Sequence, residues 1–182
     1  TEYDSALVYF SDGLKRSKKI NDKIAIAKSY YYIGEILGLH KHDREKAHEH
    51  INHAILIFEE LGARNWIARC IGTIGIIYNN QTNTHRNMGE ENEYNYYRNL
   101  TLEYYNKSLL ISQELNDTLD IAAKHSNIGS HYMSNYDFDK SIEHMMYARN
   151  LYEIFNEGKY LASCYNYISR TYLALNQHWS KI

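Results

Sequence analysis

The stretch INDKIAIAKSYYYIG at residues 20–34 decides the fold, because it returns three more times along the chain without a gap. The other copies are LGARNWIARCIGTIG (61–75), LNDTLDIAAKHSNIG (115–129) and FNEGKYLASCYNYIS (155–169). Every copy opens with an apolar residue and a short polar or glycine-containing turn. Three positions then agree throughout: an alanine (Ala27, Ala68, Ala122, Ala162), an isoleucine (Ile33, Ile74, Ile128, Ile168) and a small residue directly after it (Gly34, Gly75, Gly129, Ser169).

The spacing of these positions indicates a helix. Residues separated by six, seven and ten positions fall on or near one stripe of an α-helix, so each copy predicts an amphipathic helix, called helix A below. Glycine inside a helix costs about 1 kcal/mol relative to alanine. Its recurrence therefore predicts that a neighbouring helix backbone passes too close for a side chain.

A second apolar pattern follows in the same register and predicts a partner helix, helix B. Its alternation of small and large residues suits close packing on helix A. The pattern Ala47, Ile51, Ala54, Ile55, Phe58 and Leu61 corresponds to Ala6, Phe10, Gly13, Leu14, Ser17 and Ile20, to Thr101, Tyr105, Ser108, Leu109, Ser112 and Leu115, and to Ser141, Met145, Ala148, Arg149, Tyr152 and Phe155. The unit is a helical hairpin, and the predicted fold class is all-α.

Residues 1–182 are thus expected to form a single array of hairpins. We expect a helix B at 1–19, repeats at 20–60, 61–114 and 115–154, and a helix A within 155–182. The period is about 40 residues, and the repeat at 61–114 carries an insertion of about 13. Its polar, Asn-rich sequence at 79–99 predicts a loop, with a helical extension near Tyr94–Arg98. An array that starts and stops within a repeat also suggests a piece of a longer protein, or ends covered by a neighbour.

The composition is that of a soluble globular chain. It has 44% hydrophobic and 23% charged residues, and the combination of 0 Pro with 19 Tyr favours uninterrupted helices. A net charge of −2 argues against a nucleic-acid-binding protein, which needs a concentrated basic face. The sequence contains neither a transmembrane-length apolar run nor a signal peptide. We expect a cytoplasmic chain, or a periplasmic sensor domain if the sequence is a fragment.

The repeated positions resemble the tetratricopeptide repeat family. The motif is carried by Tyr30-x-x-Ile33-Gly34-x-x-Leu37 with Ala47-x-x-x-Ile51-x-x-Ala54, and by His125-x-x-Ile128-Gly129-x-x-Tyr132 with Ser141-x-x-x-Met145-x-x-Ala148. The period is longer than the family's usual 34 residues, and the family's proline at the repeat junction is absent. The resemblance implies a right-handed α-α superhelix, a solenoid of helical hairpins.

The resemblance also implies a binding site. In the family, the inner faces of successive A helices line a groove that receives an extended peptide or a partner helix. The outward positions of helix A that match are Lys28, Tyr31, Tyr32, Glu35, Arg69, Thr73, Ile76, Asn127, Ser130, Asn166, Tyr167 and Arg170. Asn side chains can hydrogen-bond a peptide backbone, Arg can bind a carboxylate, and Tyr offers amphipathic contact area. Each of these residues could equally be a solvated polar position.

Three functions follow as hypotheses. The leading one is a protein- or peptide-binding scaffold that serves as the sensor or interaction part of a larger bacterial signalling protein. The second is a structural module that forms homo-oligomers through its uncapped ends. The third is a peptide-responsive regulatory domain of a phosphatase-like protein or transcription regulator. The Lys/Asn/Asn/Lys/Arg set with which some family members bind chaperone C-termini does not occur at the matching positions, which disfavours a chaperone adaptor.

No catalytic motif occurs in the sequence. It lacks a phosphate-binding glycine loop, a nucleophile elbow and a His-Glu-x-x-His motif, so we expect neither an enzyme nor a cofactor. Cys70 and Cys164 occupy the same repeat position, five residues before the small residue. That equivalence predicts two free thiols in small, buried apolar positions.

One stretch, HKHDREKAHEHINH at 40–53, contains five of the ten histidines. The repeat places His40 and His42 in the turn before helix B, where Asp43 is the expected N-cap, and leaves His48, His50 and His53 on its remaining faces. Of these, His50 and His53 alone are neighbours, at i and i+3. Two imidazoles fall short of the three or four ligands that zinc usually takes, so we expect a solvated surface and no metal site.

Overall fold

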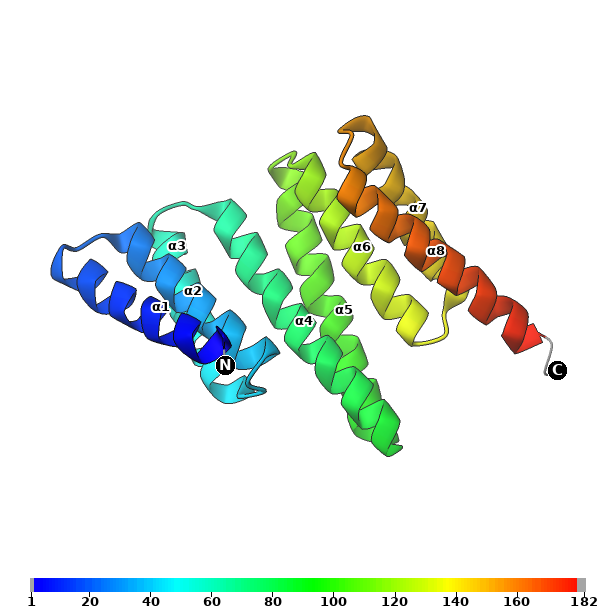
Figure 1. Ribbon diagram of the computed structural model, residues 1–182, viewed down its shortest axis with the longest axis horizontal. Coiled ribbons are helices and arrows are strands. Elements are labelled where there is room, and N and C mark those ends of the chain that lie inside the picture. Colours follow the sequence, from blue (N-terminus) through cyan, green and yellow to red (C-terminus); the bar gives the residue numbers. More distant parts are fainter. Residues whose placement is uncertain (1, 180–182) are drawn as a thin grey trace. The chain divides into compact units, whose positions relative to one another are not determined.

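The computed structural model describes residues 2–179, with side chains through residue 176, and this part of the chain is entirely helical apart from its turns (Figure 1). The helices in order are α1 (Glu2–Lys19), α2 (Lys23–Leu39), α3 (Arg44–Glu60), α4 (Arg64–Met88), α5 (Glu91–Glu114), α6 (Thr118–Ser134), α7 (Phe138–Ile154) and α8 (Gly158–Trp179). The all-α prediction is confirmed. The predicted A helices are α2, α4, α6 and α8, and the B helices are α1, α3, α5 and α7.

The chain forms two compact units, Thr1–Tyr104 and Tyr105–Ile182, and the division falls within α5. In the first unit, α2 packs between α1 and α3, and α4 follows against α3. Its core consists of Ala27, Tyr31, Ala47, Ile51, Ala54, Phe58, Cys70, Ile74 and Ile77. In the second unit, α7 packs against both α6 and α8, and its core contains Ala122, Ala148, Tyr152 and Cys164.

The close approach predicted at the glycines is confirmed. A Cβ atom added to Gly34 in α2 would lie 2.6 Å from Cγ1 of Ile51 and 2.9 Å from the backbone oxygen of Ala47, both in α3. One added to Gly129 in α6 would lie 2.9 Å from Cγ of Met145 and 3.2 Å from the backbone oxygen of Ser141 in α7. The α2–α3 and α6–α7 hairpins therefore each bring the B helix against the bare backbone of the A helix.

Left-handed residues form the turns. The positive φ angles are those of Asn21, His42, Asn116, Tyr136 and Asn156, together with Gly62 and Gly89, so each of the turns between successive described helices contains one. An acidic residue directly follows each of the five non-glycine ones and stands just before the first residue of the next helix. The carboxylates of Asp22, Asp43 and Asp117 accept the backbone N–H groups of Ala25, Lys46 and Asp120, as predicted for Asp43. Proline is not needed at these junctions.

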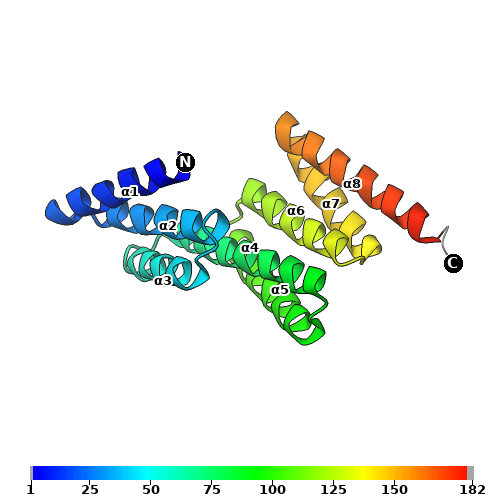
Figure 2. The same cartoon turned by 60° about the horizontal axis from the view of Figure 1, so that its bottom comes forward.

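The loop predicted at residues 79–99 is wrong, although the helical extension predicted near Tyr94–Arg98 is confirmed. Instead α4 continues to Met88, the chain turns at Gly89, and α5 begins at Glu91, so the insertion lengthens both helices, which lie side by side in both views (Figures 1 and 2). The hydroxyl groups of Thr82 and Thr101 are buried 3.2 Å apart, and the His85 ring stacks on Tyr97. Threonine, histidine and tyrosine side chains form this contact between the two helices. A search for apolar residues at helical spacing therefore does not detect the helices here.

Candidate partner-binding surface

Trp66, in the first turns of α4, is the centre of an aromatic cluster in the first unit. Its ring stacks on Phe58 of α3 with centroids 5.3 Å apart, and it meets Tyr31 and Tyr32 of α2 edge to face at 5.8 and 6.3 Å. Tyr32 in turn stacks on Phe10 of α1 at 4.9 Å. Side chains from four successive helices thus meet around one partly buried indole.

Two cations lie over this indole. The Lys28 ammonium of α2 is 5.0 Å from the ring centroid of Trp66, and the Arg69 guanidinium of α4 is 5.3 Å from it. Contacts of this kind contribute about 0.5–1 kcal/mol each at exposed sites. No described carboxylate forms an ion pair with either cation. We call Lys28, Tyr32, Trp66 and Arg69 the Trp66 surface.

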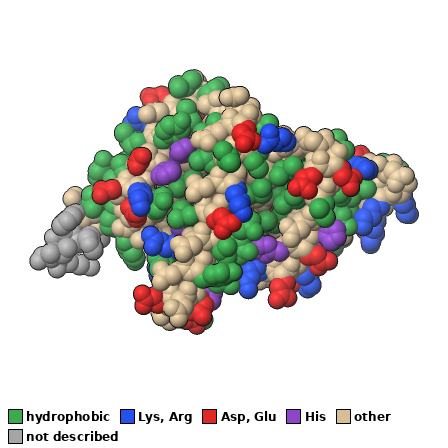
Figure 3. Space-filling view, turned by 180° about the vertical axis from the view of Figure 1, so that it is seen from behind, with side chains coloured by type: hydrophobic (Ala, Val, Ile, Leu, Met, Phe, Trp, Pro, Cys, Tyr) green, Lys and Arg blue, Asp and Glu red, His purple; other side chains and the backbone are tan. Residues whose placement is uncertain are grey.

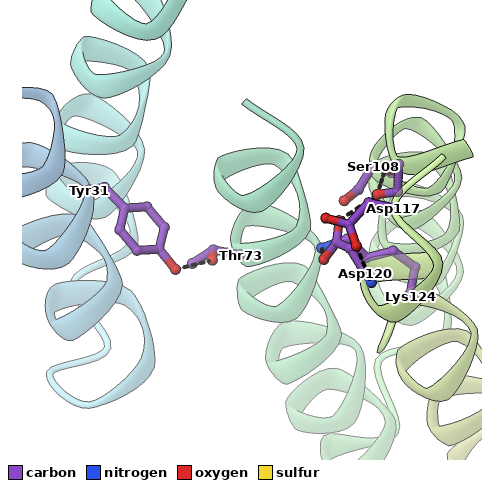
Figure 4. Close-up of polar contacts among 7 residues, drawn as sticks. Tyr31, Thr73, Ser108, Asp117, Asp120 and Lys124 are labelled. Atoms are coloured by element: carbon purple, nitrogen blue, oxygen red, sulfur yellow. Dashed lines mark hydrogen bonds and ion pairs between the residues drawn. The ribbon is translucent and has the colours of Figure 1, made fainter. Parts of the chain in front are cut away.

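Tyr31 and Thr73 are not on this surface, which corrects the prediction that they point outward. Tyr31 is 1% exposed and Thr73 is 4% exposed. The Tyr31 hydroxyl donates to Oε1 of Glu35 at 2.5 Å and lies 3.1 Å from Oγ1 of Thr73, toward which it points (Figure 4). Since the phenol has one proton, Thr73 must donate in the second contact. Burial, and then the charge of Glu35, raise the pKa of Tyr31. These three residues connect α2 to α4 internally.

The other predicted groove residues divide between the units. Ile76 is half-buried in α4 of the first unit. In the second unit, Asn127 and Ser130 are half-buried on α6, while α8 carries Asn166 and Arg170, both exposed, and the half-buried Tyr167. The Arg170 guanidinium lies 6.0 Å from the Tyr167 ring centroid. Within the first unit, the structure brings together Lys28, Tyr31, Tyr32, Glu35, Arg69 and Thr73, and the predicted residues of α6 and α8 belong to the second unit.

Sequence reasoning missed Trp66. The corresponding positions in the other repeats are Ala25, Asp120 and Tyr160, so no shared pattern identified it. The available signal was its residue type, because tryptophan is enriched among the residues that contribute most to protein interfaces.

The two thiols are free and buried, as predicted. Burial raises the pKa of the Cys70 thiol to about 12, and burial also raises that of Cys164. Both thiols therefore remain protonated at neutral pH, a state in which they are poor nucleophiles. Their repeat position is held by Ser29 in α2 and by Lys124 in α6, and these residues are buried as well.

Lys124 is paired in this buried position with Asp120, one turn earlier in α6, at 2.9 Å (Figure 4). Oγ of Ser112 in α5 lies 2.5 Å from the other oxygen of Asp120 and 3.0 Å from the backbone oxygen of Ser108, so these two acceptors share its one proton. The pair and its hydroxyl neighbour form a connected polar network at the contact of α5 with α6.

The histidine-rich stretch is mostly surface. Nδ1 of His50 and Nδ1 of His53 lie 2.9 Å from the backbone oxygens one turn earlier in α3, and the two rings pack against Tyr30. His48 differs from the prediction: it is half-buried beneath Tyr78, and its Nε2 is buried without a hydrogen-bond partner. Over the part of the chain described here, no group of three or more potential metal-ligating side chains occurs. On the face shown in Figure 3, acidic and basic side chains are interspersed.

A pair of histidines that the sequence did not suggest lies in the second unit. The Nδ1 atoms of His125 in α6 and His144 in α7 are 3.0 Å apart, with ring centroids at 5.0 Å. Burial, and then the neighbouring His144, lower the pKa of His125 to about 4, and burial lowers that of His144. The repeat alignment contained the signal, because Tyr30 and His50 hold the same positions in the first hairpin and also touch.

Comparisons with known proteins bear on the fold. Neither a family model nor a curated protein matches the chain. The structure is similar to the crystal structure of BtubC (BKLC) from P. vanneervenii, with a TM-score of 0.58 and 16% sequence identity over 97% of this chain and 75% of that chain. This likeness shows a shared all-α fold. Within the described helices, none is long and apolar enough to cross a bilayer.

Proposed function

We propose that the chain is a tetratricopeptide-type scaffold that binds a protein or peptide through the Trp66 surface, as the interaction part of a larger bacterial signalling or regulatory protein. The repeated positions of the sequence and the hairpins with glycine-mediated contacts support this proposal. The observation that carries it is the pair of cations, Lys28 and Arg69, over one indole ring. Neither forms an ion pair with a described carboxylate, and Glu35, whose charge acts on Arg69, is hydrogen-bonded to Tyr31.

This arrangement favours a partner segment with acidic side chains. A carboxylate placed between the two cations would gain charge-assisted hydrogen bonds from both, and Arg69 could bind it through two N–H groups. The aromatic rings keep the cations in place and therefore reduce the entropy that they would lose on binding. Tyr32 and Trp66 would contribute apolar contact area beside the carboxylate, as such residues do at the centres of many interfaces.

Fluorescence anisotropy with labelled peptides tests the proposal. We expect a peptide that combines Glu, Asp and apolar residues to bind, and a counterpart with Lys and Arg at the acidic positions not to bind. The double variant Lys28→Gln/Arg69→Gln should weaken binding by at least about tenfold. Lys15→Gln/Lys19→Gln removes the same charge from exposed positions of α1 and should bind as the wild type does. Equal binding by the double variant and this control would refute the assignment of the surface.

Self-association is a second candidate, favoured by one observation. In α8 the positions Ala162 and Ser169 are exposed, whereas Ala27, Ala68 and Ala122 and the corresponding glycines are buried. No described helix covers this side of α8. Light scattering over a range of protein concentrations distinguishes the candidates, since self-association through this face predicts a mass that rises with concentration.

A further inference from the structure

The His125–His144 pair brings two imidazole nitrogens together in the second unit. The two rings come from different helices of one hairpin, and their Nδ1 atoms face each other at 3.0 Å. Tyr147 packs on His125 with centroids 4.2 Å apart, and Tyr132 packs on His144 at 5.6 Å. Aromatic packing on both sides holds the rings in this position.

The pair is not a general requirement of the hairpin. Its two positions hold Tyr30 and His50 in the α2–α3 hairpin, and Ile71 and Tyr104 in α4 and α5. Side chains of very different chemistry therefore fill the same space elsewhere in the chain. Packing alone does not explain why α6 and α7 present two imidazole nitrogens to each other.

Among the described residues, the two nitrogens have no partner besides each other, whereas Nδ1 or Nε2 of four other histidines contacts a backbone or side-chain group. His50 and His53 direct Nδ1 toward backbone oxygens of their own helix, His85 contacts Glu90, and His131 contacts Asn135. At His125 and His144, Nδ1 contacts only the other ring, and Nε2 is neither bonded to a described group nor buried without a partner. A tautomer with the proton on Nε2 is therefore accessible to both rings.

The separation fits a metal chelate with neighbouring ligands at a right angle. Two nitrogens bonded at about 2.1 Å are about 3.0 Å apart when the angle at the metal is 90°, and about 3.4 Å apart in a tetrahedron. The first arrangement is that of tetragonal Cu²⁺ and Ni²⁺ with nitrogen and oxygen ligands. Water molecules would complete the coordination.

We propose that His125 and His144 bind a divalent transition-metal ion, Cu²⁺ in preference to Ni²⁺, through their two Nδ1 atoms. The proton that one ring carries on Nδ1 moves to Nε2, so both imidazoles stay neutral and no proton is released. The negative charge of Glu143, which acts on His144, favours a bound cation. The order of preference follows the usual stability series for divalent ions. This site is independent of the proposed partner-binding function.

Copper titration of the full chain, followed by electron paramagnetic resonance, tests the site. Cu²⁺ is supplied as its glycine complex, so that single surface imidazoles do not compete. We expect one ion per chain, with hyperfine coupling to two equatorial imidazole nitrogens. Coupling to a single nitrogen would overturn the proposal.

Variants locate the ion. His125→Tyr and His144→Tyr introduce the residues that corresponding A and B helices carry at these positions, and each should weaken copper binding by at least about tenfold. The control His50→Gln/His53→Gln removes the exposed pair of α3 and should leave binding unchanged. Unchanged affinity in both tyrosine variants, or loss of the signal in the control, would show that the ion binds elsewhere.

Discussion

The backbone oxygen of Ala47 would lie 2.9 Å from a methyl group on Gly34, so the hairpin of α2 and α3 closes only because residue 34 has no side chain. We expect Gly34→Ala to destabilise the protein by about 1–3 kcal/mol, because overpacking outweighs the better helix propensity of alanine. Chemical denaturation measures the change.

A matched control exists in α1. The nearest atom to a Cβ on Gly13 is Oγ of Ser29 at 3.7 Å, an ordinary contact distance, and corresponding B-helix positions hold Ala54 and Ala148. Gly13→Ala should therefore stabilise the protein by up to about 1 kcal/mol. Equal effects of the two substitutions would contradict the close approach at Gly34.

His42 adopts a φ of 57°, a left-handed conformation that Asn21, Asn116 and Asn156 adopt in corresponding turns. Asparagine tolerates this conformation better than most residues do. His42→Asn should therefore raise the free energy of unfolding by up to about 1 kcal/mol. His40→Asn is the control, since His40 has a φ of −119° and should gain nothing. A stabilised His40 variant would argue for a general effect of removing histidine from this turn.

His48 is half-buried, with an unpartnered Nε2, at a position where the other B helices carry Leu7, Leu102 and Ile142. His48→Leu should stabilise the protein by about 1 kcal/mol at neutral pH, because it removes a buried polar atom without a hydrogen bond. Thermal unfolding of both proteins over a pH series measures this change.

The pH dependence has a definite sign. Burial, and then Arg44, lower the pKa of His48 in the folded state, so the unfolded chain binds more protons at acidic pH. Wild-type stability should therefore fall as the pH drops below about 6.5, the usual value for histidine. The advantage of His48→Leu should widen over the same range. A constant difference between the two proteins would mean that His48 titrates normally in the folded state.

Asp120 holds the buried ammonium of Lys124, and its removal should leave that charge without a partner. Asp120→Ala is expected to destabilise the protein by about 2–3 kcal/mol, below the range for a fully enclosed pair because the Asp120 side chain is 31% exposed. The double variant Asp120→Ala/Lys124→Ser reproduces Ala25 and Ser29 of α2 and should recover most of the loss. Denaturation of the single and double variants completes the comparison. A double variant no more stable than Asp120→Ala would show that the ammonium is not the source of the loss.

Much of the fold was predictable because the sequence contains four copies of one pattern, so that equivalent positions can be compared within a single chain. Taken by itself, Ala27 gives no indication of its environment. Its equivalence to Ala68 and Ala122 predicted a buried helix position, and all three side chains have 0% exposure. The same comparison identified Gly34 as a contact point. It failed for residues 79–99, because an insertion has no counterpart elsewhere in the chain and its helices pack through Thr82, Thr101 and Tyr97.

The candidate site was harder to predict because the direction of a side chain depends on the next helix. Tyr31 lies at a position that faces outward in the resembling family, yet Thr73 and Arg69 of α4 cover it here. The residue type of Trp66 was the one signal in the sequence, and its cation partner Lys28 is brought over its ring only by the packing of α2 against α4. His125 and His144 are 19 residues apart, so no local spacing rule finds them.

The left-handed residues in the turns have a consequence for how such chains can be rebuilt. Each junction is specified by one residue and, in most cases, the acidic cap that follows it, with no long-range contact required for the change in direction. Asn21-Asp22 and Asn116-Asp117 are chemically identical joints at different points of the array. The two hairpins between them, α2–α3 and α4–α5, could therefore be excised or duplicated together with their joints intact, which makes this turn a suitable place for shortening or extending the protein.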